Sequence, residues 1–269
     1  MRFIDKSILE KEAEDIVCYF LKELKKEGIA YPMDLYKAFG SAKDTNKNFL
    51  KELLTNLLFK EQQNYCCYCM CKLEKGEETI EHIIPNKVKN KAEFEKYLRP
   101  NTVLNSKKVC FAKEFIENEG RTFPPYPHTI AYQNLAVSCN GKFSKSESTT
   151  HCNLERGDKY IEPFILDNLL VEKIEYKPDG SVILENGDAF IKILGLNENR
   201  LKMIRRIWLY ANKFDCKIMD YDNTQKTEFL YKLLAEIPDD EIEMLFNFNK
   251  ESYWKIVVNK YNYFASYKK

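Results

Sequence analysis

The fold is decided by the stretch CCYCMCKLEKGEETIEHIIP, residues 66–85. Four of the nine cysteines of the chain lie within its first six residues. The amino terminus carries charges where a secretion signal needs an apolar run, so a disulfide framework is not expected. In a reducing compartment such crowding indicates metal or redox chemistry, and Cys66 and Cys69 form a C-x-x-C pair that suits one tetrahedral ion.

A closed tetrahedral zinc site needs two more ligands than this pair supplies. We expect them at Cys139 and Cys152, which lie far along the chain and each precede an asparagine. The sequence therefore predicts a structural zinc ion held by Cys66, Cys69, Cys139 and Cys152, with no open position for water.

Three other residues compete for places in this site. Cys67 and Cys71 lie in the same crowded run, although the C-x-x-C spacing favours the first pair, and His151 could replace Cys152. Burial of small side chains would explain isolated cysteines, but not so many in so short a run. A redox pair normally opens a helix after a strand, whereas this one continues into Met-Cys-Lys-Leu.

A second candidate for chemistry follows the cysteines. Glu81 and His82 lie inside residues 79–84, a short β-branched run that predicts a strand, and Pro85 would end it. On a strand the two side chains point to opposite sides unless a turn brings both toward one ion. A histidine beside a glutamate is, taken alone, more often structural than catalytic.

Two asparagines lie beside the predicted distant zinc ligands. Asn134 precedes Cys139 by five residues, and Asn153 directly follows Cys152. The zinc ion would hold both segments beside the C-x-x-C turn, and so beside His82. A metal site can thus assemble four polar residues that are spread over about seventy positions of the chain.

Helical and hairpin patterns flank this region. Apolar residues recur at helical spacing in residues 6–27 and 46–60, which predicts two amphipathic helices. Residues 171–184 form two short strand-like runs around Pro-Asp-Gly, a hairpin signal, and the chain is helical in character from Asp188 onward.

We expect an α+β fold in which a small core with a structural zinc is flanked by helical segments. Between the motif blocks lies a basic, proline-rich stretch of weak periodicity, residues 86–131, which is interpreted as a long insertion. The predicted parts are an N-terminal helical segment (1–62), the core with its insertion (63–165), and a hairpin with a C-terminal helical segment (166–269).

Bulk composition leaves the class of protein open but limits it. With 269 residues and 44% hydrophobic content the chain can bury a sizeable core, and no run of about 18 apolar residues predicts a membrane span. A cytoplasmic protein is expected. The net charge of +1 favours no polyanion globally, yet residues 81–113 carry eight Lys or Arg against three Glu. That stretch is either a phosphate-binding patch or a solvated loop.

The order of these motifs resembles the HNH, or ββα-metal, nuclease family. The family pattern is C-x-x-C, an acidic residue with His, two apolar residues and Pro, then Asn-Leu, then a second cysteine pair followed by Asn or His. The matching residues are Cys66 and Cys69, Glu81 to Pro85, Asn134-Leu135, Cys139, and Cys152-Asn153. Two departures are a Glu in place of the commoner Asp, and twelve residues instead of two between the second pair of cysteines.

A narrower likeness covers roughly residues 50–210. The run E-H-I-I-P-N-K, the Pro-Asp-Gly hairpin and the run L-G-L-N-E-N-R-L at 194–201 look like the PtuB-type HNH subunit of Septu and retron anti-phage systems. This resemblance implies a nuclease in anti-phage defence that works with a larger ATPase subunit of the PtuA kind. Residues 188–213 and 251–267 are the expected docking helices.

The resemblance also implies a chemistry. Glu81 and Asn153 would bind a catalytic divalent ion such as Mg²⁺, His82 would be the general base, and Asn134 would orient the site by hydrogen bonds. Three basic residues are candidate phosphate contacts: Lys142, Arg156 and Lys159. DNA is the favoured substrate. The alternatives are a ribonuclease acting on structured RNA such as tRNA, and a zinc-stabilised nucleic-acid-binding subunit with no chemistry.

Overall fold

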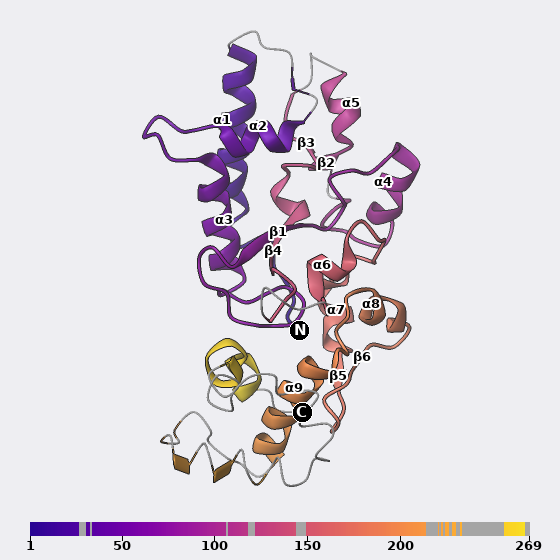
Figure 1. Cartoon of the computed structure of the whole chain (residues 1–269). Coiled ribbons are helices and arrows are strands. Elements are labelled where there is room, and N and C mark those ends of the chain that lie inside the picture. The colour runs from indigo at the N-terminus through magenta and orange to yellow at the C-terminus, as the bar shows by residue number, and fades with distance from the viewer. Residues whose placement is uncertain are drawn as a thin grey trace.

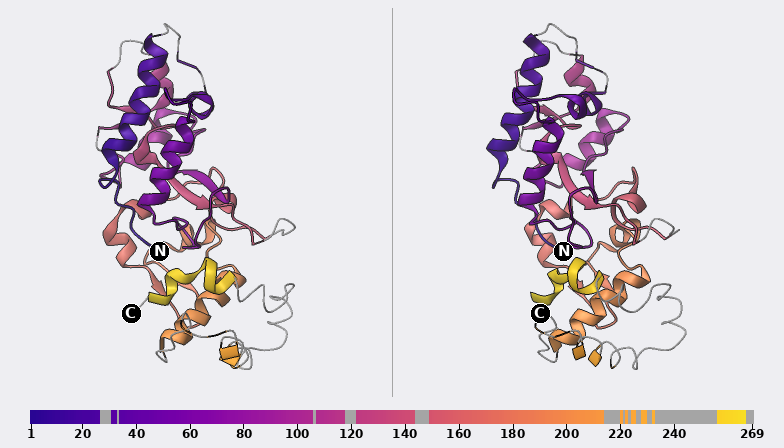
Figure 2. Two further views of the ribbon diagram at one scale, coloured as in Figure 1. Left: turned by 90° about the vertical axis from the view of Figure 1, so that its left-hand side faces the viewer. Right: turned by 60° about the vertical axis from the view of Figure 1, so that its left-hand side comes forward.

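The computed structural model describes residues 1–26, 31–32, 34–105, 107–117, 122–143, 149–213 and 256–266, with short pieces at 220, 222, 224–225, 228–229 and 232. The molecule is elongated, with the first three helices and the segment 91–116 toward one end, a two-stranded sheet near the middle and the helices from residue 168 onward toward the other end (Figures 1 and 2). This confirms a mixed fold of helices and small sheets. Within the described ranges, no helix combines the length and apolar character that crossing a bilayer requires.

Three helices form the N-terminal part. They are α1 (Glu10–Lys26), α2 (Leu35–Ser41) and α3 (Leu50–Glu61). Helix α1 starts four residues later than the predicted 6–27, and it buries Ala13, Val17, Phe20 and Leu21, which share one helical face. Helix α3 likewise lies within a few residues of the predicted 46–60. The Asp34 carboxylate caps α2 by accepting the backbone N–H of Lys37 at 2.9 Å.

The centre of the molecule is an antiparallel pair of strands, β1 (Glu78–His82) and β4 (Leu135–Cys139). Their register places Glu78 opposite Cys139 and His82 opposite Leu135. All five residues of β4 are buried, because α3 packs against this strand and so does the short helix α6 (Cys152–Arg156). Strand β1 ends before Pro85, as predicted.

The stretch 86–131 contains more regular structure than an insertion of weak periodicity predicts. It forms α4 (Lys91–Leu98), β2 (Val109–Cys110), α5 (Ala112–Ile116) and β3 (Tyr126–Pro127), and β2 pairs with β3 in parallel. Each element buries only about two apolar side chains, such as Phe94 and Tyr97 of α4, so no periodic pattern was visible in the sequence.

The C-terminal part begins with the 3₁₀ turn η2 (Phe164–Leu166), then α7 (Asn168–Glu172) and the hairpin of β5 (Glu175–Tyr176) and β6 (Val182–Ile183). The hairpin is present but shorter than the predicted 171–184, because residues 171 and 172 belong to α7. Residues 188–213 form two helices, α8 (Asp188–Ile193) and α9 (Asn199–Lys213), rather than one. Gly195 separates them with a φ of +59°, and a Cβ there would lie 2.9 Å from the carbonyl oxygen of Thr150.

The last described residues pack back onto the first part of the chain. They form the π-helical turn η4 (Ile256–Lys260) and the 3₁₀ helix η5 (Asn262–Ser266); the predicted helix 251–267 otherwise lies outside the described residues. Tyr65 donates to the Asn262 side-chain oxygen at 2.8 Å, and Tyr263 donates to the Met1 carbonyl at 3.1 Å.

A buried ion pair fixes the N-terminal residues beside the central sheet. Lys6 donates to Glu61 of α3 at 2.8 Å and to the carbonyl oxygen of Leu135 in β4 at 2.6 Å. Its ammonium also lies 4.4 Å from the ring centre of Tyr132, whose hydroxyl donates to the other oxygen of Glu61. Burial lowers the pKa of Lys6, and the Glu61 charge opposes that shift.

Replacing Lys6 by Met should lower the free energy of unfolding by about 3–5 kcal/mol, because the Glu61 carboxylate is then left buried without its counter-charge. Urea denaturation followed by circular dichroism measures the loss. The double variant Lys6→Met/Glu61→Gln should recover much of it, since the neutral amide can still accept from Tyr132. A single variant as stable as the wild type would contradict this account.

Candidate metal centre and polar site

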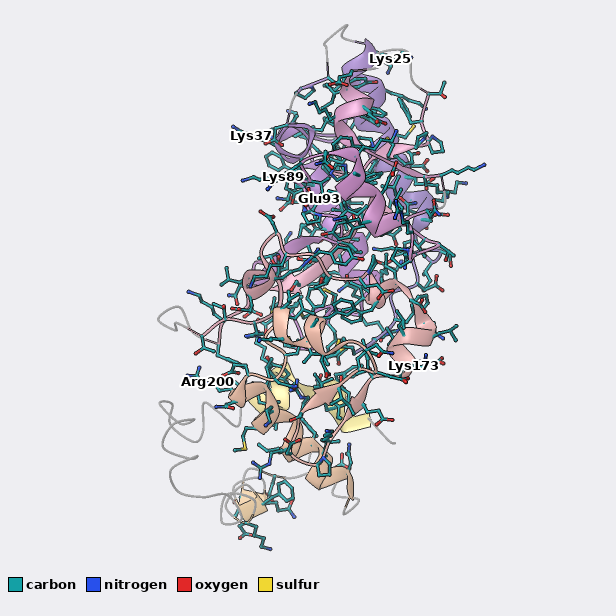
Figure 3. The ribbon with its side chains drawn as sticks, turned by 90° about the vertical axis from the view of Figure 1, so that its right-hand side faces the viewer. Lys25, Lys37, Lys89, Glu93, Lys173 and Arg200 are labelled. Carbon is teal, nitrogen blue, oxygen red and sulfur yellow. The ribbon has the colours of Figure 1, made fainter. Side chains whose placement is uncertain are left out.

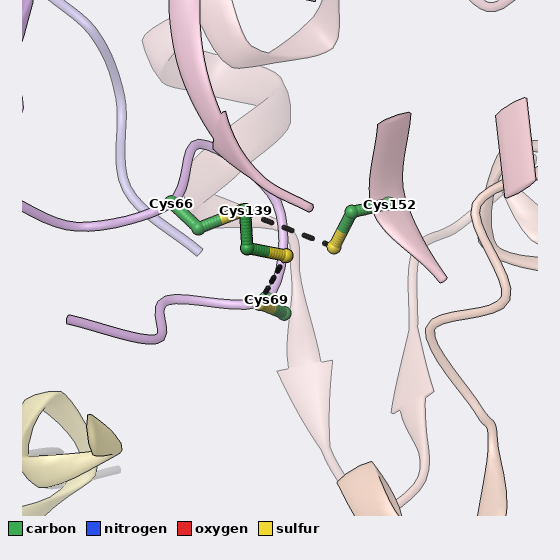
Figure 4. Close-up of side chains that lie close together, drawn as sticks. All are labelled: Cys66, Cys69, Cys139 and Cys152. Carbon is green, nitrogen blue, oxygen red and sulfur yellow. Dashed lines mark hydrogen bonds between the residues drawn. The ribbon is translucent and has the colours of Figure 1, made fainter. Parts of the chain in front are cut away.

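Four cysteine sulfurs meet in the interior (Figure 4). Cys66 and Cys69 come from the turn after α3, Cys139 ends β4, and Cys152 begins α6. The Cys66 and Cys152 sulfurs are 3.8 Å apart, as are those of Cys69 and Cys139, and all four lie within 4.8 Å of one another. A zinc ion with bonds of about 2.3 Å to four sulfurs at tetrahedral angles requires sulfur separations of about 3.8 Å. The group could therefore bind a metal ion such as zinc.

Local backbone bonds shape the turn that carries the first pair. The Cys66 amide donates to the Cys71 carbonyl at 2.8 Å, which closes the turn, and Met70 takes a positive φ of 62° inside it. The Cys67 amide donates to Val137 of β4 at 3.1 Å. The turn is thus attached to the strand whose last residue is Cys139.

The three alternative ligands lie next to the four-sulfur group but are not part of it. Cys67 and Cys71 are buried, but neither belongs to the set of mutually close sulfurs. His151 does not replace Cys152; its Nε2 lies 3.6 Å from the Cys139 sulfur. Among the described residues, the four predicted cysteines are the group whose geometry suits a metal ion.

The long separation between Cys139 and Cys152 is closed by a backbone contact. The His151 amide donates to the Gly141 carbonyl at 3.0 Å, which returns the chain to the sheet. Gly141 has a φ of +72°, and a Cβ there would lie 2.3 Å from the His151 carbonyl oxygen. Only glycine permits this approach. The twelve intervening residues therefore do not prevent the two cysteines from meeting.

Charging all four buried sulfurs at once requires a cation, although the pKa shifts of the individual cysteines differ. Burial acts to raise the pKa of Cys66 and Cys69, but hydrogen bonds from neighbouring thiols outweigh it and lower both values. Burial first, and then the neighbouring sulfurs, raise the pKa of the Cys152 thiol well above its ordinary value. Four thiolates packed together would repel one another in this interior, and a divalent cation removes that penalty.

Helix α6 connects this centre to Glu81. Its first residue, Cys152, belongs to the sulfur group, and its last, Arg156, forms a buried ion pair with Glu81 of β1. Arg156 also donates to the Ile83 carbonyl at 2.7 Å. Arg156 is only 1% exposed, so the expectation that it contacts phosphates is wrong for this structure.

Glu81 is held by one of its two carboxylate oxygens. Tyr68 donates to Oε1 at 2.7 Å, and the Arg156 guanidinium pairs with the same atom. Among the described residues none donates to Oε2. Burial raises the pKa of Glu81, and the Arg156 charge acts in the opposite direction.

His82 lies on the other face of the strand. Its Nε2 is 3.0 Å from the carbonyl oxygen of Thr129, so Nε2 carries the proton and Nδ1 has the free lone pair. No described residue bonds Nδ1. The Tyr36 ring packs edge-on against the imidazole, with ring centres 4.6 Å apart at 80°. Burial lowers the pKa of His82 to about 4, so the imidazole is neutral at neutral pH.

The two asparagines differ in what they contact. Asn134 is fully buried; its oxygen accepts from the Ile84 amide at 2.6 Å, and its amide donates to the carbonyls of Ile84 and His128. It holds the chain after β1 in place and touches no solvent. Asn153 is half-exposed, and its amide donates to the Thr79 hydroxyl at 3.1 Å, which leaves its oxygen without a described partner.

The structure thus brings some predicted residues together and separates others. Asn153, through Thr79, and Glu81 share one face of β1, whereas His82 points to the other, with no turn between Glu81 and His82. The sequence did not reveal the contacts that hold these groups, made by Tyr68, Tyr36, Thr129 and Arg156. Tyr68 had one available signal, its position inside the C-x-x-C pair.

Comparison of the chain with protein-family models, with curated proteins and with solved structures finds no match.

Purified protein prepared without chelators should contain about one equivalent of zinc per chain, measured by metal analysis. Structural zinc supplies on the order of 10 kcal/mol of apparent binding energy, so Cys69→Ser should yield insoluble or zinc-free protein. Cys67→Ser is the matched control, because Cys67 lies two residues away and outside the sulfur group. Zinc retained at full level in Cys69→Ser would overturn this ligand set.

Proposed function

We propose that the chain is a metal-dependent nuclease of the HNH type, with β1, β4 and α6 as its ββα-metal core. One observation carries the proposal: three expected groups are each anchored by one polar atom and keep another without a described partner. The anchored atoms are Glu81 Oε1, His82 Nε2 and Asn153 Nδ2. The atoms without a described partner are thus an oxygen of the buried Glu81 carboxylate, the lone pair of the His82 imidazole and the oxygen of the Asn153 amide.

These atoms suit phosphodiester hydrolysis. The free Nδ1 of neutral His82 can take a proton from water, while the Thr129 carbonyl keeps the ring in the required tautomer. Oxygen atoms of Glu81 and Asn153 are the ligands that a hard ion such as Mg²⁺ prefers. Such an ion, when bound, would neutralise charge on the scissile phosphate.

In this proposal Arg156 and Asn134 position the site. The Arg156 charge favours the ionised form of Glu81 by pairing with one of its oxygens, and Asn134 fixes the loop that follows His82.

His82→Ala should lower the cleavage rate by about 10² to 10⁴, because the general base is lost, with zinc content and fold unchanged. The assay follows cleavage of plasmid DNA, and of total tRNA in parallel, with Mg²⁺ added. His82→Asn is the matched control, because asparagine keeps a polar side chain of similar size but cannot act as a base. Full activity in both variants on either substrate would falsify the assignment of His82 as the base.

Asn153→Ala and Glu81→Gln should both raise the Mg²⁺ concentration needed for half-maximal cleavage, whereas Asn153→Asp, which keeps an oxygen ligand, should stay active. If Glu81→Gln lowers stability but leaves the Mg²⁺ requirement unchanged, Glu81 only pairs with Arg156 and is no ligand. Circular dichroism and zinc analysis separate loss of fold from loss of metal binding.

The proposal extends to a partner, an ATPase subunit encoded beside this chain, as the resemblance to PtuB-type proteins implies. A free nuclease would endanger the genome of its own cell, so some restraint is expected. Co-expression with the adjacent gene product followed by size-exclusion chromatography should give one complex. A chain that remains monomeric and cuts efficiently alone would refute the partner and leave the nuclease standing.

A further inference from the structure

Helices α2 and α3 bring a lysine and a tyrosine next to His82. The Tyr36 ring of α2 packs edge-on against the imidazole at 4.6 Å, and the Lys51 ammonium of α3 lies 4.8 Å from the centre of the same tyrosine ring. A single aromatic ring therefore separates Lys51 from His82. Both Tyr36 and Lys51 are half-buried, so their positions are fixed by packing while part of each stays accessible.

Lys51 forms no ion pair within the described part of the chain. No described carboxylate lies within 4.0 Å of its ammonium, although its neighbour Glu52 pairs with Lys75 at 3.7 Å. The charge lies near the site, because the Tyr36 ring contacts both the Lys51 ammonium and the His82 imidazole. A half-buried cation next to a neutral imidazole attracts an anion to that position.

The surface is hollowed at both ends of α2. One hollow, of about 310 Å³, is lined by Gly40 and Lys51, and the acidic groups there are Glu52, which faces Lys75, and Glu78. Two lysines and two glutamates line that hollow; Glu52 pairs with Lys75, whereas Lys51 and Glu78 form no ion pair within the described residues.

The other hollow, of about 330 Å³, begins at Asp34 and includes Thr129, whose carbonyl holds His82. Its basic residues are Lys87, Lys89 and Lys113, and its acidic ones are Asp34, which caps α2, and Glu117. Lys89 lies on the same side of the molecule as Lys37, which belongs to α2 (Figure 3). Lysines thus line both hollows, and one hollow includes Thr129, which holds His82.

We propose that Lys51, held over Tyr36, binds a backbone phosphate of the nucleic acid adjacent to the phosphate at His82. This rests on the proposed nuclease function. Lys51 donates to phosphate oxygens as a point charge, and Tyr36 is a positioning residue that fixes both the ammonium and the imidazole. The N-terminal helices thereby belong to the substrate site, and the contact carries no base specificity.

Equilibrium binding without added Mg²⁺ tests the subsite apart from cleavage. The probes are a fluorescein-labelled DNA duplex and a labelled structured RNA, measured by anisotropy over a range of salt concentrations. Lys51→Gln should weaken binding roughly five- to tenfold at about 0.1 M salt and reduce the salt slope by about 1, as loss of one phosphate contact requires. Lys51→Arg should retain both the affinity and the salt slope of the wild type.

The chain offers a matched control. Lys43 lies 4.4 Å from the ring centre of Phe49, the same kind of pair in the same helical part, but it has no contact with His82. Lys43→Gln should bind both probes as the wild type does. Tyr36→Phe should keep the affinity, and Tyr36→Leu should lose it and also lower kcat, since His82 then loses its packing partner.

The outcomes separate the two proposals. If Lys51→Gln binds with the affinity and salt slope of the wild type, or weakens no more than Lys43→Gln, the phosphate subsite is overturned whether or not the protein cuts. Wild-type protein that binds neither probe overturns it as well. If Lys51→Gln loses affinity as expected but no variant shows Mg²⁺-dependent cleavage, the subsite stands and the nuclease function fails.

Discussion

The mutual approach of four cysteine sulfurs is the constraint on which the centre of this molecule depends. They join a turn, the end of a strand and the start of a helix that the chain supplies from three separate places. Helix α6 has five residues, far too few to be stable alone in water. It persists because Cys152 holds its first residue at the sulfur group and Arg156 ties its last to Glu81.

Burial of the Arg156–Glu81 pair gives α6 a defined orientation at an energetic cost. Hydrogen bonds lower that cost: Tyr68 donates to the paired oxygen of Glu81, and the backbone carbonyls of His82 and Ile83 accept from the Arg156 guanidinium. Asn153 lies between these two anchors of α6. Its orientation is therefore coupled both to the sulfur group and to the ion pair, so the metal centre and the polar site form one structural unit.

The sequence predicted the four sulfur ligands because metal geometry restricts residue type and spacing so tightly. The helices α1 and α3 were predictable from apolar periodicity, to within a few residues at their ends. The elements of 86–131 were not, since each is too short to show a period. Arg156 was assigned to phosphate because nothing in the sequence indicates that its charge is buried against Glu81. Tyr36 and Lys51 were missed for a related reason: contacts between α2, α3 and β1 exist only after the chain has folded.

The order in which the sulfurs occur along the chain has a consequence during synthesis. Cys66 and Cys69 leave the ribosome some seventy residues before Cys139 and more than eighty before Cys152. The turn that carries the first pair therefore forms before the other two sulfurs exist. Closing such long loops costs conformational entropy that only the completed contacts repay. A nascent chain that ends before α6 therefore lacks both the second sulfur pair and Asn153. The sulfur group therefore comes together late in synthesis, after most of the polar residues of the site have already been made.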